Sequence, residues 1–230
     1  MEAYNTLIQT IALSMGVAWA SGINLYGTLL VLGVMSNMGY VDLPPDLQIV
    51  GDPLVIAAAG LMYMVEFFAD KIPGVDTGWD TIHTLVRIPA GALLAAGAVG
   101  DVSQVAELAA AIVGGGIAAG THFTKAGTRV LINTSPEPFS NWGASIGEDI
   151  AVFAGIWAAL HHPVIFLVLL VIFILLMVWL LPKLFRAIKK VVRFFVNLFA
   201  GKKDPEFKPD PVPDVKPEPP TLPPKDQATT

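Results

Sequence analysis

Long apolar blocks, separated by short polar segments, dominate the first 181 residues. Residues 163–181 read PVIFLVLLVIFILLMVWLL and contain no charge. Because an α-helix rises about 1.5 Å per residue, this segment alone crosses most of a ~30 Å hydrocarbon core. The pattern therefore predicts an all-α membrane protein with about six membrane-embedded helices. The other mainly apolar blocks are residues 3–40, 53–68, 79–100, 102–133 and 146–160.

The composition supports this class of protein. Hydrophobic residues make up 54% of the chain and charged residues 14%, and the mean hydropathy is +0.63. Soluble domains carry about 25% charged residues, so this chain has too little polar surface for a water-facing particle. It has no cysteine, which excludes disulfides, thiolate metal sites and cysteine nucleophiles.

The few cations predict an orientation. Before Pro182 the only Lys and Arg residues are Lys71, Arg87, Lys125 and Arg129, and residues 38–52 contain acids but no cation. Cytoplasmic loops near span ends retain Lys and Arg. Six crossings with both termini in the cytoplasm satisfy these placements.

Two of the apolar blocks are too long for simple spans. As single helices, residues 3–40 and 102–134 would each measure roughly 50 Å. Both carry glycine near the middle or the end. We expect each of them to break or tilt, either as a kinked span or as a re-entrant hairpin.

The two long blocks also resemble each other. Residues 20–28, ASGINLYGT, are echoed by residues 119–128, AGTHFTKAGT, and a proline-bearing loop follows in both halves. This predicts two inverted three-element repeats, residues 1–100 and 101–181. Inverted repeats with discontinuous helices are typical of secondary transporters. Alternatively, the glycines are close-packing positions between helices.

A first polar cluster follows the second apolar block. Glu66 and Asp70 are spaced i,i+4 and share one helix face. Arg87 would lie roughly 10 Å inside the membrane boundary, where it needs a carboxylate partner, and we expect Glu66, Asp70 or Asp80 to supply it. The cluster could relay protons or bind an ion, or it could join two helices and cap the third. Four polar residues share one face of the third helix: Asp76, Asp80, His83 and Arg87.

A second polar cluster is basic at its start. His122, Lys125 and Arg129 form a stripe at a helix end, and Glu137, Asn141, Glu148 and Asp149 follow on the same side of the membrane. The stripe could attract anionic headgroups or pair with the acidic cluster. The corresponding segment of the first half is uncharged, which favours one mixed site over two equivalent ones. Its polar residues are Ser21, Asn24, Tyr26 and Thr28.

Two segments carry a family resemblance: DKIPGVDTGWDTIH with the later RIPAGALLA, and HFTKAGTRVLINTSPEPFSNWGASIGED. Over roughly residues 5–163 the chain resembles the domain of unknown function 4126 family of small bacterial membrane proteins. The resemblance implies a multi-span domain in a bacterial inner membrane and brings no activity with it. The polar positions that it implies are Asp70, Asp76, Asp80, Arg87, His122, Lys125, Arg129, Glu137, Asn141 and Asp149.

The C-terminal region changes character twice. Residues 182–203 alternate cations with apolar residues at helical spacing, which predicts an amphipathic helix on anionic lipid at the inner interface. Alternatively, this helix packs against the same protein in an oligomer. Residues 204–230 are proline-rich, which predicts a disordered tail and allows a protein partner. The cations predicted to bind the membrane surface are Lys183, Arg186, Lys189, Lys190 and Arg193.

We expect a transporter or channel for a small polar or anionic solute or a lipid headgroup. A non-transporting scaffold that recruits a partner is the second hypothesis, and a lipid-modifying enzyme is the third. No P-loop, HEXXH, GXGXXG or GXSXG motif is present, so we expect no enzyme, metal, cofactor or nucleic-acid partner. The residues expected along the path are Ser21, Asn24, Tyr26, Glu66, Asp70, Asp76, Asp80, His83, Arg87, His122, Lys125, Arg129, Glu137, Asn141 and Asp149.

Overall fold

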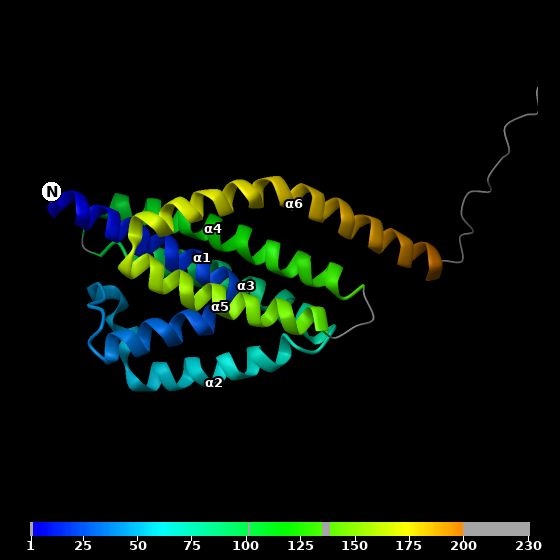
Figure 1. Ribbon diagram of the computed structural model, residues 1–230, viewed down its shortest axis with the longest axis horizontal. Coiled ribbons are helices and arrows are strands. Elements are labelled where there is room, and N and C mark those ends of the chain that lie inside the picture. The colour runs from blue at the N-terminus through cyan, green and yellow to red at the C-terminus, as the bar shows by residue number, and fades with distance from the viewer. Residues whose placement is uncertain (1, 101, 135–138, 200–230) are drawn as a thin grey trace, which may run out of the picture. The chain divides into compact units, whose positions relative to one another are not determined.

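The computed structural model describes residues 2–100, 102–134 and 139–199. All regular elements in these ranges are helices, which confirms the all-α prediction (Figure 1). A compact unit extends to Val192, and a second unit begins at Arg193. The elements are α1 (Glu2–Asn37), η1 (Pro45–Gly51), α2 (Pro53–Ala69), α3 (Val75–Gly97), α4 (Gln104–Ile132), α5 (Phe139–His161) and α6 (Pro163–Phe199).

Several helices are suited to a membrane. By length and composition α1, α4, α5 and α6 can each cross one, and η1 with α2, bent by 67°, would form a fifth span. This is compatible with a multi-pass membrane protein. The expected count of six is not reached in this way, because α3 carries the charged residues Asp76, Asp80 and Arg87.

Helix α1 doubles back on itself at Asn24, which has the extended dihedrals φ −146° and ψ 97°. Ser14 on the first arm bonds to Ala95, near the end of α3. After the second arm the chain returns to the same end of α3, where Leu47 touches Gly97. A straight helix of this length would hold its ends roughly 50 Å apart, so α1 is a re-entrant hairpin (Figure 1).

The hairpin corrects the expected topology. Because α1 enters and leaves at one end of the bundle, only α2 to α6 run from end to end (Figure 1). The start of α1 lies beside residues 40–44 and the end of α5. It is therefore at the opposite end from Lys71, and the expected six crossings with the N-terminus on the Lys71 side are wrong. We call the end with residues 38–52 the acidic end, and the end with residues 70–74 the basic end.

The second long block does not break. Helix α4 is continuous from Gln104 to Ile132, so the interruption expected in both halves is present only in the first. Two of its glycines serve close packing instead. Gly114 faces Ala95 of α3, and Gly127 faces Leu184 of α6, with no room for a Cβ in either place. This is the alternative that the sequence left open.

The amphipathic stretch predicted at residues 182–203 continues α6 through Pro182, as far as the structure describes it, to Phe199. Leu184, on the apolar side of this stretch, is buried against Gly127 of α4. At Leu184, the apolar side of this amphipathic stretch therefore packs against another helix of the same chain instead of against lipid. The cations on the other side, including Lys183 and Arg186, are exposed.

Candidate functional site

The second arm of α1 begins at the break and is capped by Asn24, the residue at which the helix is interrupted. The Asn24 side-chain oxygen accepts a hydrogen bond from the Gly27 backbone N–H at 2.7 Å, so Asn24 is the N-cap of the second arm. Its amide nitrogen donates to Asp149 Oδ1 of α5 at 3.0 Å. The break is therefore an ordered feature, fixed by one side chain that serves two partners.

The other helix end at the break meets a cation. Lys125 Nζ of α4 donates to the Ile23 carbonyl at 3.1 Å, a group left without a helical partner by the interruption. The C-terminal end of a helix carries partial negative charge and the N-terminal end partial positive charge. Lys125 lies at the negative end of the first arm, and the Asp149 carboxylate lies near the positive end of the second.

Lys125 belongs to a buried ion-pair network that joins α2, α3, α4 and α5. Arg87 contacts Glu66 at 2.7 Å and Asp80 at 2.8 Å, which confirms the expected pairing of this arginine. Lys125 contacts Asp70 at 2.8 Å and lies near three other carboxylates. Arg129 completes the network through Glu148 at 2.6 Å and Asp70 at 3.7 Å.

The network holds more carboxylates than cations. Its ion pairs link the cations Arg87, Lys125 and Arg129 to four carboxylates. With every group ionised, one negative charge is uncompensated. A buried charge without a partner is costly, so the arrangement favours uptake of a proton or a cation. The four carboxylates are those of Glu66, Asp70, Asp80 and Glu148.

Asp149 adds another carboxylate to this region. Within the described residues it makes no ion pair within 4 Å, and no hydrogen bond within 3.5 Å reaches its buried Oδ2, although the Tyr63 hydroxyl and the Lys71 ammonium lie nearby. Glu66, Asp70 and Asp80 each also have one buried carboxylate oxygen without a hydrogen-bond partner. Protonation of such a carboxylate removes its buried negative charge, which is the costly part of burying it.

His122 is held between two helices. Arg87 lies 3.3 Å from its Nδ1 and can only donate, so that nitrogen is the acceptor. Its Nε2 lies 2.7 Å from Thr84 Oγ1, which donates to the Asp80 carbonyl. Nε2 therefore carries the proton and the imidazole is neutral. Protonation of Nδ1 would place a second donor against Arg87.

A second histidine lies beside the break. His83 Nδ1 is 2.9 Å from the Trp79 carbonyl, which can only accept, so Nδ1 carries the proton. Its Nε2 then accepts from the Tyr26 hydroxyl at 3.1 Å. The two expected site residues Tyr26 and His83 are thus brought together, next to the ion-pair network and without an ion pair of their own.

Two other expected residues form a polar cluster at the basic end, next to the network, since Arg129 Nη1 donates to the Asn141 carbonyl at 3.1 Å. Asp76 Oδ1 accepts from the backbone of Gly74 and Thr77 and from Asn133, so it stabilises the start of α3. Asn141 donates to Asn133 at 2.7 Å. Asp76 and Asn141 therefore fit the helix-joining reading best.

Two expected residues fall outside these clusters. Ser21 donates to the Ala18 carbonyl and lies against Gly91 of α3, on the apolar first arm. Glu137 lies outside the described residues. The remaining expected residues come together from five helices or arms, as the mixed-site hypothesis requires.

Sequence reasoning missed several partners. Glu148, which was not among the site residues expected from the sequence, pairs with Arg129. Thr84 carries no signal of its own in the sequence. Lys71 was used only for orientation, yet it is buried, donates to Ser145 Oγ at 3.2 Å and lies 3.0 Å from the Phe67 ring centroid. Burial lowers the pKa of Lys71, and the neighbouring Asp149 and Asp70 oppose this shift.

The site is closed towards the acidic end. Asn24 and His122 are buried, and none of the four cavities that we characterised is lined by either residue. Buried apolar side chains fill the space between the two arms of α1, α3 and α5. The Glu148 side chain, 19% exposed, is the most accessible carboxylate of the network. Asn24 and His122 are therefore shielded from bulk water in this conformation.

The described residues form an all-helical domain with a buried charge network at a broken helix, and several of its helices are compatible with a multi-pass membrane protein. The chain belongs to the family described as domain of unknown function DUF4126, whose family model matches residues 11–183. This confirms the resemblance seen in the sequence. The matched range includes every residue of the ion-pair network. Neither the comparison with curated proteins nor that with solved structures gave a match.

Proposed function

We propose that this protein is a secondary transporter that binds a proton or a small cation beside Asp149. The observation that carries the proposal is the interruption of α1 at Asn24. Helix ends that meet charged side chains inside a membrane domain are the usual ion and substrate sites of transporters built from broken helices. Here Lys125 meets one helix end and Asp149 lies near the other.

The charge balance supports a cation over an anionic solute. The network has one more carboxylate than cations, and the neighbouring Asp149 and Lys71 add one charge of each sign, so the excess stays at one. The buried Oδ2 of Asp149 has no hydrogen-bond partner within 3.5 Å among the described residues. An anion would add to the uncompensated negative charge. A proton or a small cation would neutralise it, so the earlier expectation of an anionic solute is not carried into this proposal.

The orientation is part of the proposal. Lys71 and the exposed cations of α6 up to Lys190 lie towards the basic end, which the positive-inside rule assigns to the cytoplasm of a bacterial inner membrane. The start of α1 would then face the opposite side. The network lies nearer the cytoplasm, and the exposed cations Lys183, Arg186, Lys189 and Lys190 would meet anionic lipid there.

The test uses the proton as the probe. The purified protein is reconstituted into liposomes, and proton-driven currents after a pH jump are recorded on a solid-supported membrane. Asp149→Asn keeps an oxygen for the Asn24 amide but removes the titratable group, so we expect currents to fall to those of empty liposomes. Asp46→Asn, an exposed change of the same kind at the acidic end, should leave them unchanged.

Equal currents from the unmodified protein, Asp149→Asn and empty liposomes would refute the transporter proposal. The scaffold hypothesis would then be favoured by a specific observation, since eight ion pairs among buried groups can join four helices without moving an ion. Under that hypothesis, deleting residues 204–230 abolishes partner recruitment. Under the transporter proposal, the same deletion leaves the currents intact.

A further inference from the structure

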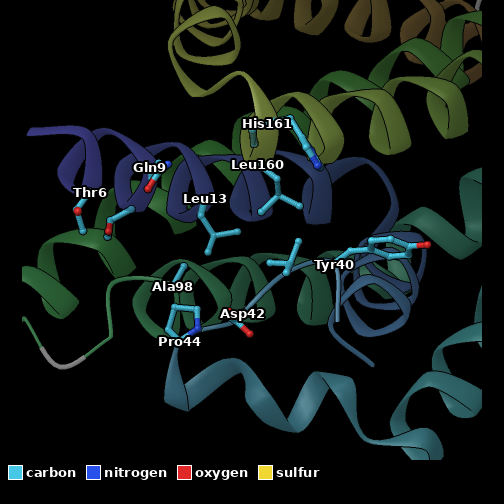
Figure 2. A pocket seen from close by; sticks show the side chains of 12 residues that line it. Thr6, Gln9, Leu13, Tyr40, Asp42, Pro44, Ala98, Leu160 and His161 are labelled. Carbon is cyan, nitrogen blue, oxygen red and sulfur yellow. The ribbon is translucent and has the colours of Figure 1, made fainter. Parts of the chain in front are cut away.

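A cavity of about 390 Å³ opens at the acidic end of the bundle. Figure 2 shows its walls: Thr6 and Gln9 come from the first arm of α1, Tyr40 and Asp42 from the segment after the second arm, and His161 from the end of α5. The only Asp, Glu, Lys or Arg side chain among its lining residues is Asp42. None of these residues was expected to be functional from the sequence.

The floor of this cavity leads towards the charge network. Leu13 of α1 and Leu160 of α5 lie at the floor (Figure 2). From each of them a row of residues at helical spacing runs deeper, and the apolar members of both rows belong to one packed cluster. The row on α1 is Leu13, Val17, Ala20 and Asn24. The row on α5 is Leu160, Ile156, Val152 and Asp149.

The two rows end at the same hydrogen bond, Asn24 to Asp149. Eleven residues separate Leu13 from Asn24, which is about 16 Å along a helix. In the described part of the chain this is the one hydrogen bond that joins α1 to α5. We call the contact between α1 and α5 the α1–α5 seam. Apart from this hydrogen bond, the seam consists of small residues against apolar ones, such as Gly16 against Ala159 and Gly155 against Trp19. Separation of the seam therefore breaks few polar contacts.

We infer that this cavity is the outer vestibule of the path to Asp149, that it admits small cations, and that the α1–α5 seam is its gate. The inference rests on the proposed function and adds the route and the selecting residue. Asp42 gives the vestibule a negative charge with no cation in its lining. Since residues 38–52 and 98–104 contain no Lys or Arg, no nearby loop cation offsets that charge.

The absence of cysteine in the chain makes the test direct. Single cysteines are introduced by Thr10→Cys in the vestibule wall and Val17→Cys in the first buried layer below the floor. Each variant, in liposomes at low ionic strength, is treated with membrane-impermeant cationic or anionic methanethiosulfonate. Leu61→Cys, exposed on α2, is the control for a lipid-facing thiol and should react with neither reagent.

Because a thiolate itself attracts the cationic reagent, each rate is divided by the rate of the same reagent with a small free thiol. After this normalisation we expect the thiol of Thr10→Cys to favour the cationic reagent roughly fivefold, the ratio expected when one unit charge lies about 8 Å away in water. Adding Asp42→Asn should bring this ratio close to one. The thiol of Val17→Cys should react more slowly with the same preference, and its modification should block the proton-driven current.

Two results would overturn the inference: an unreactive thiol in Val17→Cys under conditions where the unmodified protein carries current, or a charge preference that persists in Asp42→Asn. The failures of the two proposals can be told apart. If Asp149→Asn abolishes the current but Val17→Cys never reacts, the transporter proposal stands and this route is wrong. If Val17→Cys reacts but the unmodified protein carries no current, the gate opens and the transporter proposal is wrong.

Discussion

Arg87 should be among the most sensitive positions for stability. Its side chain is fully buried and forms two charged hydrogen bonds, to Glu66 at 2.7 Å and to Asp80 at 2.8 Å. Arg87→Met removes one of the three network cations, so the excess negative charge increases from one to two. Removing one partner of a buried ion pair costs about 3–5 kcal/mol, because the remaining charge is left uncompensated.

A companion variant changes the net charge of the network in the opposite direction. Glu66→Gln removes one negative charge and balances the network, while the amide oxygen still accepts from Arg87. We expect a cost below about 1.5 kcal/mol, the net value of a typical hydrogen bond. In the double variant Arg87→Met/Glu66→Gln the original charge excess of one is restored. The two changes should therefore be non-additive, with the double variant about 1–3 kcal/mol more stable than the sum of the single variants predicts.

The assay is reversible unfolding by SDS in mixed micelles, followed by circular dichroism. Lys183→Met, at an exposed cation on α6 that lies over the Trp179 ring, is the control for loss of a positive charge. It should change the free energy of unfolding by less than about 1 kcal/mol. Additivity of Arg87→Met and Glu66→Gln within about 0.5 kcal/mol would refute the charge-balance argument.

Two further changes test the packing and the break. Gly127→Ala forces a Cβ into Leu184 and should destabilise by about 1–3 kcal/mol, whereas Gly116→Ala on the same helix enters open space and should be neutral or slightly stabilising in the same SDS titration. An equal effect of both would contradict the close α4–α6 contact. Asn24→Ala removes the cap of the second arm and the bond to Asp149, and we expect a loss of about 1–2 kcal/mol. An unchanged free energy of unfolding would mean that the break does not depend on this cap.

The sequence determined the class of protein through apolar length and low charge, which depend on local composition alone. It also placed most of the network correctly. An arginine such as Arg87 cannot lie in a membrane unpaired, so its carboxylate partners could be sought at helical spacing. The family resemblance, confirmed over residues 11–183, followed from the same polar segments.

Only the tertiary structure decided how the long blocks run. Glycine at positions 22 and 27 looked much like glycine at 120 and 127, yet α1 reverses and α4 does not. The difference comes from partners distant in sequence: Lys125 caps the first arm of α1 and Asp149 holds Asn24, whereas the glycines of α4 fit against α3 and α6. Whether a helix breaks depends on which groups are available to satisfy its freed backbone, and local sequence does not contain that information.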